Sequence, residues 1–154
     1  MIRAVRISKA KHKKQAFTGI GTQFASGRWH HKMTSIVYCS DTSALAALEV
    51  FVHLQEEAKR INFVSFELGI PKNLILEAED IATLPKRWRS QPPGAGTKKI
   101  GSDWVTSMSS AVLGVPSTMI LNERNYLLNP AHPDFSKITI NDSEPFRFDS
   151  RLWK

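Results

Sequence analysis

The stretch from Thr42 to Arg60 constrains the fold of this chain more than any other part of its sequence. Its apolar residues recur at steps of three and four positions, the pattern of an amphipathic helix that faces a core. These residues are Leu45, Leu48, Phe51 and Val52. Ser40 or Asp41, just before the stretch, can cap the first turn of such a helix. The rest of the chain must therefore supply the core that this face contacts.

Glu49 is the unusual residue of this helix. At about 100° per residue it projects only about 40° from Leu45, which places it at the edge of the apolar stripe. A carboxylate loses favourable hydration there unless it finds a partner. Glu49 is therefore either an edge residue paired with a basic neighbour or a carboxylate positioned in a cleft beside the helix.

Strand-like runs outnumber helical ones and are spread along the chain. Residues 2–8 predict a short strand at the edge of a sheet, where its arginines reach water, and residues 35–39 predict a buried strand. Further strands are expected at 62–68, 73–78, 115–120, 138–140 and 146–148, with a short apolar piece at 126–130. A second helix is expected at 102–113, a loop at 18–28, and a loop or lid at 85–99. This order predicts an α+β fold with a mixed central sheet.

Length and charge narrow the class of protein. The 154 residues are expected to form one domain, 1–154, and the net charge of +7 attracts nucleic acid, phosphorylated ligands or an acidic protein. The basic cluster from Lys9 to Lys14 is either a solvated turn or a contact for a phosphate or a partner. A lone cysteine, Cys39, excludes an internal disulfide framework. The absence of a long apolar run or a signal-peptide pattern predicts a cytoplasmic protein that does not bind a membrane.

Several familiar motifs are missing. The chain has no Walker loop and no nucleophile elbow, and Gly19-Ile20-Gly21 is followed by Phe24 where a dinucleotide fingerprint has glycine. No closely spaced cysteine and histidine cluster is present, and the adjacent rings of His30 and His31 point in different directions in most backbones. No metal site is therefore expected.

Three further residues are candidates for chemistry, each with an ordinary structural alternative. Arg28 follows Ser26-Gly27, where glycine lets the backbone approach a ligand and the guanidinium can bind phosphate in a forked geometry; surface loop arginines are also common. Tyr38 lies near the end of the 35–39 strand, just before the turn into the Glu49 helix, and either lines the same cleft or is a core aromatic. Ser117 is either a ligand contact or a small polar residue in a strand.

Five segments, read together, form a recognisable series. They are Ser26-Gly27-Arg28-Trp29, Ile36-Val37-Tyr38, Ala44 to His53, Val115-Pro116-Ser117 and Asn125 to Phe135. In this order they resemble the RES domain, a family named for its arginine, glutamate and serine. With Arg6-Ile7 near the start, the resemblance covers nearly the whole chain.

The resemblance implies both a fold and a function. It implies a fold similar to that of ADP-ribosyltransferase toxins, and a toxin of a type II toxin–antitoxin pair. Such a toxin consumes NAD⁺ by hydrolysis or phosphorolysis, or transfers ADP-ribose to a protein. The family's functional residues fall on Arg28, Tyr38, Glu49 and Ser117, with Asn129 as an addition. Glu49, Arg28 and Tyr38 would be catalytic, while Arg28, Tyr38, Ser117 and Asn129 would bind NAD⁺.

The resemblance also implies partners. It implies an Xre-type antitoxin with a helix-turn-helix domain, contact with DNA only through that antitoxin, and a homodimer in some members. The chain departs from the pattern after Arg28-Trp29, where many relatives have asparagine and a nearby glycine and this chain has His30-His31-Lys32-Met33. A competing interpretation is a basic nucleic-acid-binding module or a ribonuclease-type toxin. The charge supports it, but no helix-turn-helix or RNA-binding pattern does.

Overall fold

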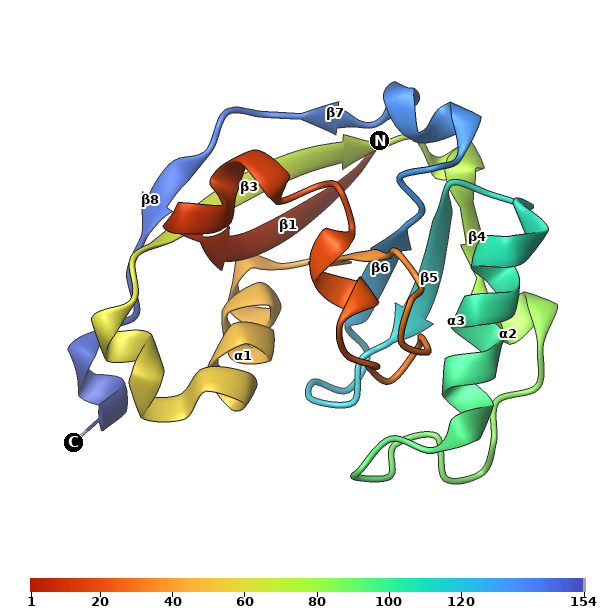
Figure 1. Cartoon of the computed structure of the whole chain (residues 1–154), viewed down its shortest axis with the longest axis horizontal. Helices are drawn as coiled ribbons and strands as arrows, with labels where there is room; N and C mark the ends of the chain where they lie inside the picture. The colour runs from red at the N-terminus through yellow and green to blue at the C-terminus, as the bar shows by residue number, and fades with distance from the viewer. Residues whose placement is uncertain (154) are drawn as a thin grey trace.

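Eight strands form one mixed sheet in the computed structural model, which describes residues 1–153 (Figure 1). The strands are β1 (Ile2–Lys9), β2 (Val37–Ser40), β3 (Phe63–Ile70), β4 (Ile75–Glu77), β5 (Val112–Pro116), β6 (Arg124–Leu128), β7 (Thr139–Ile140) and β8 (Glu144–Phe146). Their order is β4-β5-β6-β2-β1-β3-β7, and β8 also pairs with β3. All pairs are antiparallel except β4–β5. The predicted α+β class with a mixed sheet is confirmed.

Within residues 1–153, three α-helices and six 3₁₀ helices accompany the sheet. The α-helices are α1 (Ser43–Leu54), α2 (Ala78–Ile81) and α3 (Ala95–Ser107). The 3₁₀ helices are η1 (Ala10–Gln15), η2 (Ile20–Gln23), η3 (Gln55–Arg60), η4 (Lys72–Leu74), η5 (Pro133–Lys137) and η6 (Ser150–Trp153). No helix within residues 1–153 is both long enough and apolar enough to cross a bilayer.

The helix expected at 42–60 is present but divided, and its cap differs from the expectation. The Thr42 hydroxyl caps α1 by accepting a hydrogen bond from the Leu45 amide at 3.1 Å, so neither Ser40 nor Asp41 has this role. Gln55 has a φ of 52°, a left-handed value that few side chains favour, and α1 ends before it. The chain then continues to Arg60 as the tighter η3.

Two other expectations were wrong in position. The second helix is α3, which starts within the segment expected to be a loop and ends well before residue 113. Its buried positions are Thr97, Gly101 and Trp104. Only one of these is a large apolar residue, so the first turns of the helix carry no apolar stripe. The strand expected at 115–120 is β5, which runs from Val112 to Pro116, because Ser117 begins a turn.

Strand β1 was expected at the edge of the sheet and instead lies near its centre, between β2 and β3. It pairs with β3 along its whole length, whereas its registered contact with β2 is limited to Val5 opposite Ser40. Arg6 crosses this weak seam. Its buried guanidinium donates to the Tyr38 carbonyl oxygen at 2.8 Å and to the Ala16 carbonyl oxygen at 2.7 Å. A side chain thus replaces part of the missing strand ladder.

Helices α1 and α3 cover the same face of the sheet at separate places (Figure 1). Residues opposite each other in antiparallel strands share a face, so Val5, Ser40 and Asn125 lie on one side, together with Tyr38 and Leu127. Val5 belongs to the apolar cluster that contains Ala46 of α1, and Leu127 to the cluster that contains Trp104 of α3. The polar residues of β2 and β6 therefore lie between two apolar clusters.

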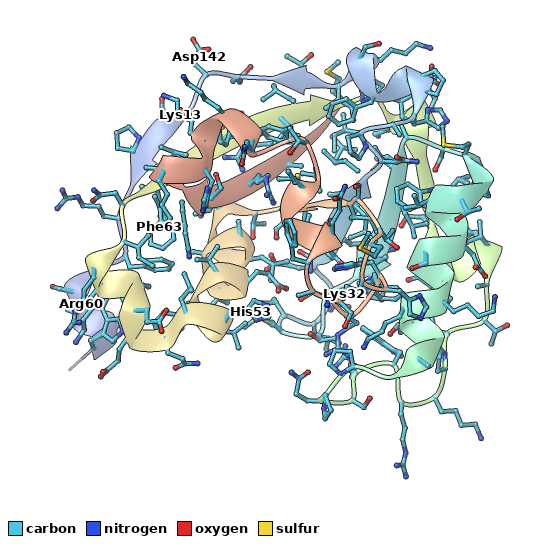
Figure 2. All side chains as sticks on the ribbon, viewed as in Figure 1. Lys13, Lys32, His53, Arg60, Phe63 and Asp142 are labelled. Atoms are coloured by element: carbon cyan, nitrogen blue, oxygen red, sulfur yellow. The ribbon has the colours of Figure 1, made fainter. Side chains whose placement is uncertain are left out.

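The opposite ends of the molecule are filled by aromatic side chains. Phe63 packs in the α1 cluster with Phe148, and Figure 2 shows it on the side of β3 that faces α1 and η3. At the other end, Trp29 is 3% exposed and packs in the cluster beneath α3. Phe63 and Trp29 thus anchor the elements on either side of the polar residues of β2 and β6.

Gly101 lets α3 approach the backbone of Trp29. A Cβ atom at position 101 would lie only 1.7 Å from the Trp29 carbonyl oxygen, a contact that real atoms do not make. Alanine favours a helix over glycine by about 1 kcal/mol. Here the steric cost outweighs that gain, because the group in the way is backbone and cannot rotate aside.

We therefore expect Gly101→Ala to lower the free energy of unfolding by about 1–3 kcal/mol, the usual cost of overpacking. Thermal unfolding monitored by circular dichroism measures this loss. Gly21→Ala is the matched control, because a Cβ atom there meets nothing within 4 Å. A Gly101→Ala protein as stable as the wild type would show that α3 does not rest on Trp29 in this way.

Candidate functional site

A tight turn at residues 27–30 presents the first candidate residue. Gly27 and His30 form an isolated antiparallel bridge, in which the Gly27 amide donates to the His30 carbonyl oxygen at 3.2 Å. Trp29, at the tip, is buried in the core below α3, while Arg28 remains partly exposed. The turn thus uses the tryptophan as an anchor and holds the arginine at the surface.

Arg28 is bound to the segment that precedes α3. Its Nη1 donates to the carbonyl oxygens of Trp88 at 2.7 Å and Ser90 at 2.9 Å, and its Nη2 donates to the Gln91 side-chain oxygen at 2.9 Å. Three of the five guanidinium N–H donors are used in this way. The Nε–H and one Nη2–H have no hydrogen-bond partner within residues 1–153.

Arg28 and Glu49 are close enough to influence each other electrostatically. Burial lowers the pKa of the Arg28 guanidinium, and the negative charge of Glu49 acts in the opposite direction. Arginine stays protonated despite such shifts. The structure therefore brings a permanent cation and a carboxylate to the same part of the surface, although their sequence positions are in a loop and a helix.

Asn125 holds the Glu49 carboxylate. Its Nδ2 donates to Glu49 Oε1 at 3.0 Å, and its Oδ1 accepts a hydrogen bond from the Ser40 hydroxyl at 2.7 Å. Ser40 and Asn125 are buried and lie opposite each other on β2 and β6. Glu49 makes no ion pair within the described residues, so the partner of this half-buried carboxylate is an amide and not a basic neighbour. Its Oε2 has no hydrogen bond within residues 1–153.

The Tyr38 side chain is hydrogen bonded to His30. The distance between the Tyr38 hydroxyl and His30 Nδ1 is 2.6 Å, and His30 Nε2 lies 2.8 Å from the Ala25 carbonyl oxygen. A carbonyl can only accept, so Nε2 carries a proton; in the neutral imidazole, which burial favours, Nδ1 then accepts from the tyrosine. Burial raises the pKa of Tyr38, which therefore keeps its proton, and the charge of Glu49 acts in the same direction.

Ser117 and Asn129 have hydrogen-bond partners of their own. The Ser117 hydroxyl accepts from the amides of Met119 at 3.0 Å and Ile120 at 3.1 Å, and so closes the turn after β5. Asn129 follows β6, about 13 Å along the strand direction from Asn125. Its side-chain oxygen accepts from the Ala131 amide, and its nitrogen donates to the Val105 carbonyl at the end of α3. Neither residue is hydrogen bonded to Arg28, Tyr38 or Glu49.

The structure therefore unites three of the five predicted residues and adds three others. Sequence reasoning missed Ser40 and Asn125, and considered His30 only as a metal ligand. A polar residue beside the apolar run 126–128 was a usable signal for Asn125, but nothing in the sequence pairs it with Glu49. Within residues 1–153, no group of three or more histidine, cysteine, aspartate or glutamate side chains is placed to hold a metal ion.

Two surface cavities lie elsewhere. One, of about 530 Å³, is bordered by residues 79–84, and the other, of about 380 Å³, by residues of η3 and the C-terminal segment 147–153. Arg28, Tyr38 and Glu49 line neither of them. The constellation is therefore identified by its charges and hydrogen bonds and not by a cavity.

The fold and the site together define an α+β protein that presents a cation, a phenol and a carboxylate on the sheet face between two helices. Residues 3–149 match the family model described as RES domain. The chain belongs to the RES domain family, and the resemblance found in the sequence is confirmed.

Named relatives agree with this family. The protein "Toxin Res" of Yersinia enterocolitica is 36% identical over 151 residues, which cover 96% of this chain and 97% of the relative. "Toxin Res" of Photorhabdus laumondii is 37% identical, with coverage of 97% and 96%. "Prs ADP-ribosylating toxin" of a Sphingobium species is 36% identical, with coverage of 88% and 85%.

One solved structure shares the fold. The crystal structure of the M. tuberculosis MbcT-MbcA toxin-antitoxin complex contains a chain that superposes with a TM-score of 0.77 at 13% identity. The match covers 94% of this chain and 84% of that one. At this identity the comparison establishes the fold and not the chemistry.

His30 gives the site a predictable response to pH. Burial lowers its pKa below the ordinary 6.5, and the nearby Lys98 and His31 act in the same direction. The unfolded chain therefore binds a proton more readily than the folded one as the pH falls below about 6.5. The free energy of unfolding should fall over this range, by at most about 1.4 kcal/mol per pH unit from this group.

Urea unfolding of the wild type and of His30→Asn at pH 7.5, 6.5 and 5.5 measures this effect. Other titrating groups are common to both proteins, so the difference between the two profiles reports His30. We expect the wild type to lose more stability than the variant on acidification. Parallel profiles would show that His30 titrates normally in the folded protein.

Proposed function

We propose that this protein is a toxin that cleaves the nicotinamide–ribose bond of NAD⁺ and so depletes it. One observation carries the proposal: Arg28 and Glu49 are close enough to interact electrostatically, each is held by its own hydrogen bonds, and each has donors or an oxygen left over for a ligand. The ADP-ribosylating name of the Sphingobium relative supports NAD⁺ as the substrate, because NAD⁺ is the usual donor of ADP-ribose.

Arg28 is proposed to bind the pyrophosphate. Its unused Nε–H and Nη2–H can form the two parallel hydrogen bonds that a phosphate group accepts from a guanidinium. The carbonyl oxygens of Trp88 and Ser90 fix the other part of the group, so little side-chain freedom is lost on binding. The net charge of +7 also favours approach of an anionic substrate.

Glu49 is proposed to stabilise the reaction centre. Breaking the bond to nicotinamide leaves positive charge on the ribose, in an oxocarbenium-like transition state. Asn125 fixes Glu49 Oε1, so the uncommitted Oε2 can face that charge or a ribose hydroxyl without reorganisation. Nicotinamide leaves as a neutral molecule from a cation, so this step requires no strong general acid.

The remaining candidate residues are proposed to make supporting contacts with NAD⁺. Tyr38 is proposed to flank the nicotinamide ring. Ser117 is proposed to hydrogen bond the nicotinamide amide or the ribose; its hydroxyl accepts two backbone hydrogen bonds, and its own proton remains available as a donor. The contact of Asn129 with NAD⁺ stays a prediction from the family pattern, and its amide is already bonded at the end of α3.

Glu49→Gln is expected to lower the rate of nicotinamide release from NAD⁺ by at least 100-fold, because the charge is lost while size and shape are kept. Chromatography of nicotinamide measures the rate. Glu56→Gln, an exposed change in η3, is the matched control and should retain wild-type activity. An active Glu49→Gln protein would remove Glu49 from the mechanism.

Arg28→Lys is expected to raise the KM for NAD⁺ at least tenfold, because lysine keeps the charge but cannot contact the phosphate and the 88–91 carbonyls together. Initial rates over a range of NAD⁺ concentrations measure this. Arg87→Lys, on the same segment and exposed, serves as the control. An unchanged KM in Arg28→Lys would exclude the bidentate role.

A second candidate function is transfer of ADP-ribose to a protein, which the Sphingobium relative's name favours. The same residues would serve both reactions, and the acceptor distinguishes them. Incubation with NAD⁺ labelled in its adenylate part, with and without phosphate and with cell lysate, separates the products. Free ADP-ribose shows hydrolysis, ADP-ribose-1″-phosphate shows phosphorolysis, and a discrete labelled protein band shows transfer.

We further propose that an antitoxin holds this toxin inactive. The structural neighbour was solved as a toxin–antitoxin complex, which supports this class of partner. An Xre-type protein with a helix-turn-helix domain is the partner that the family pattern implies, and it would carry any contact with DNA.

A further inference from the structure

We infer that His30 is a positioning residue for Tyr38, which it holds through a hydrogen bond from the tyrosine hydroxyl to the ring nitrogen Nδ1. The inference rests on the proposed function for the reaction that it serves. It assigns a role in the site to the last residue of the turn that carries Arg28, a residue that is not hydrogen bonded to Glu49.

The hydrogen bonds around the neutral imidazole of His30, the form that its burial favours, allow only one arrangement. His30 is 3% exposed, and both ring nitrogens have a partner: Ala25 at 2.8 Å and Tyr38 at 2.6 Å. Because the Ala25 carbonyl fixes the proton on Nε2, Nδ1 must accept and the tyrosine must donate. The Tyr38 proton is therefore directed at His30, and the phenol oxygen presents only lone pairs to any ligand.

Gly27 shows that this contact is built into the turn. A Cβ atom at position 27 would lie 2.7 Å from His30 Cε1, 2.9 Å from its Nδ1 and 3.2 Å from the Tyr38 hydroxyl oxygen. A side chain there would displace the imidazole or the phenol. The glycine before Arg28 is thus needed for the pair behind the arginine, besides any close approach of a ligand.

The same turn links the pair to Arg28. His30 closes the bridge to Gly27 with its backbone while its side chain holds Tyr38 on β2. Arg28 lies between the two bridge residues, so one histidine sets the place of the arginine and the phenol relative to each other.

Two substitutions separate these roles. In His30→Asn, the amide oxygen can take the place of Nδ1 and keep the acceptor for Tyr38, while the contact with Ala25 is lost. In His30→Gln, the amide nitrogen can take the place of Nε2 and keep the donor to Ala25, while the acceptor for Tyr38 is lost. We expect kcat for NAD⁺ cleavage to stay within about threefold of wild type in His30→Asn and to fall at least tenfold in His30→Gln.

A double-mutant cycle with Tyr38→Phe tests whether the loss passes through the tyrosine hydroxyl. If it does, His30→Gln has no further effect on kcat once that hydroxyl is absent. Equal losses in His30→Asn and His30→Gln, or effects that add in the cycle, would overturn the inference. Circular dichroism of each variant identifies any that fails to fold, and the cycle then uses the remaining substitution.

A measurement on the free protein separates this inference from the proposed function. Nitrogen NMR of the histidines reports which ring nitrogen carries the proton. We expect His30 to be protonated at Nε2 with an acceptor signal at Nδ1 that shifts in Tyr38→Phe, and the opposite tautomer would overturn the inference whatever the activity. A wild-type protein with the expected tautomer that leaves NAD⁺ intact would instead refute the proposed function.

Discussion

The Arg6 guanidinium is the interaction on which the rest of the site depends. Strands β1 and β2 barely pair, and the side chain of Arg6 reaches across to the Tyr38 carbonyl in place of a strand ladder. This bond fixes the backbone of Tyr38. The Tyr38 side chain lies on the sheet face opposite to Arg6, where its hydroxyl is hydrogen bonded to His30. The cost of burying a charge at this seam is offset by two backbone acceptors and by the Phe17 ring nearby. In a fully paired strand ladder, backbone groups and not a side chain would hold the Tyr38 carbonyl.

The polar residues Ser40 and Asn125 lie between the apolar clusters beneath α1 and α3 and are themselves buried. Ser40 and Asn125 are buried polar groups, and each is satisfied by the other or by Glu49. Such groups cost free energy only when they are left without partners. The network therefore keeps a carboxylate half-buried and oriented without an ion pair, which leaves the charge of Glu49 available to a substrate.

The sequence predicted those parts of the molecule that depend on local patterns. The α1 helix, the long β3 strand and the α+β class follow from periodicity and order, and Glu49 stood out because a carboxylate on an apolar margin is unusual. The first turns of α3 could not be found, since the buried positions there are Thr97 and Gly101, and Gly101 is buried because of its close approach to Trp29 and not because of hydrophobicity. The roles of His30 and Asn125 were equally hidden. Ser40 meets Asn125 across 85 positions of sequence, and only the fold brings them together.

The bonds from Arg28 to the 88–91 segment have a consequence for how this family of sites can change. One guanidinium holds a surface loop and, in the proposed function, also binds an anion. Substitutions in the loop should preserve most of this fastening, because two of its three contacts are backbone carbonyls that any residue supplies. Replacement of the arginine should instead release the loop and, in the proposed function, the bound anion at the same time.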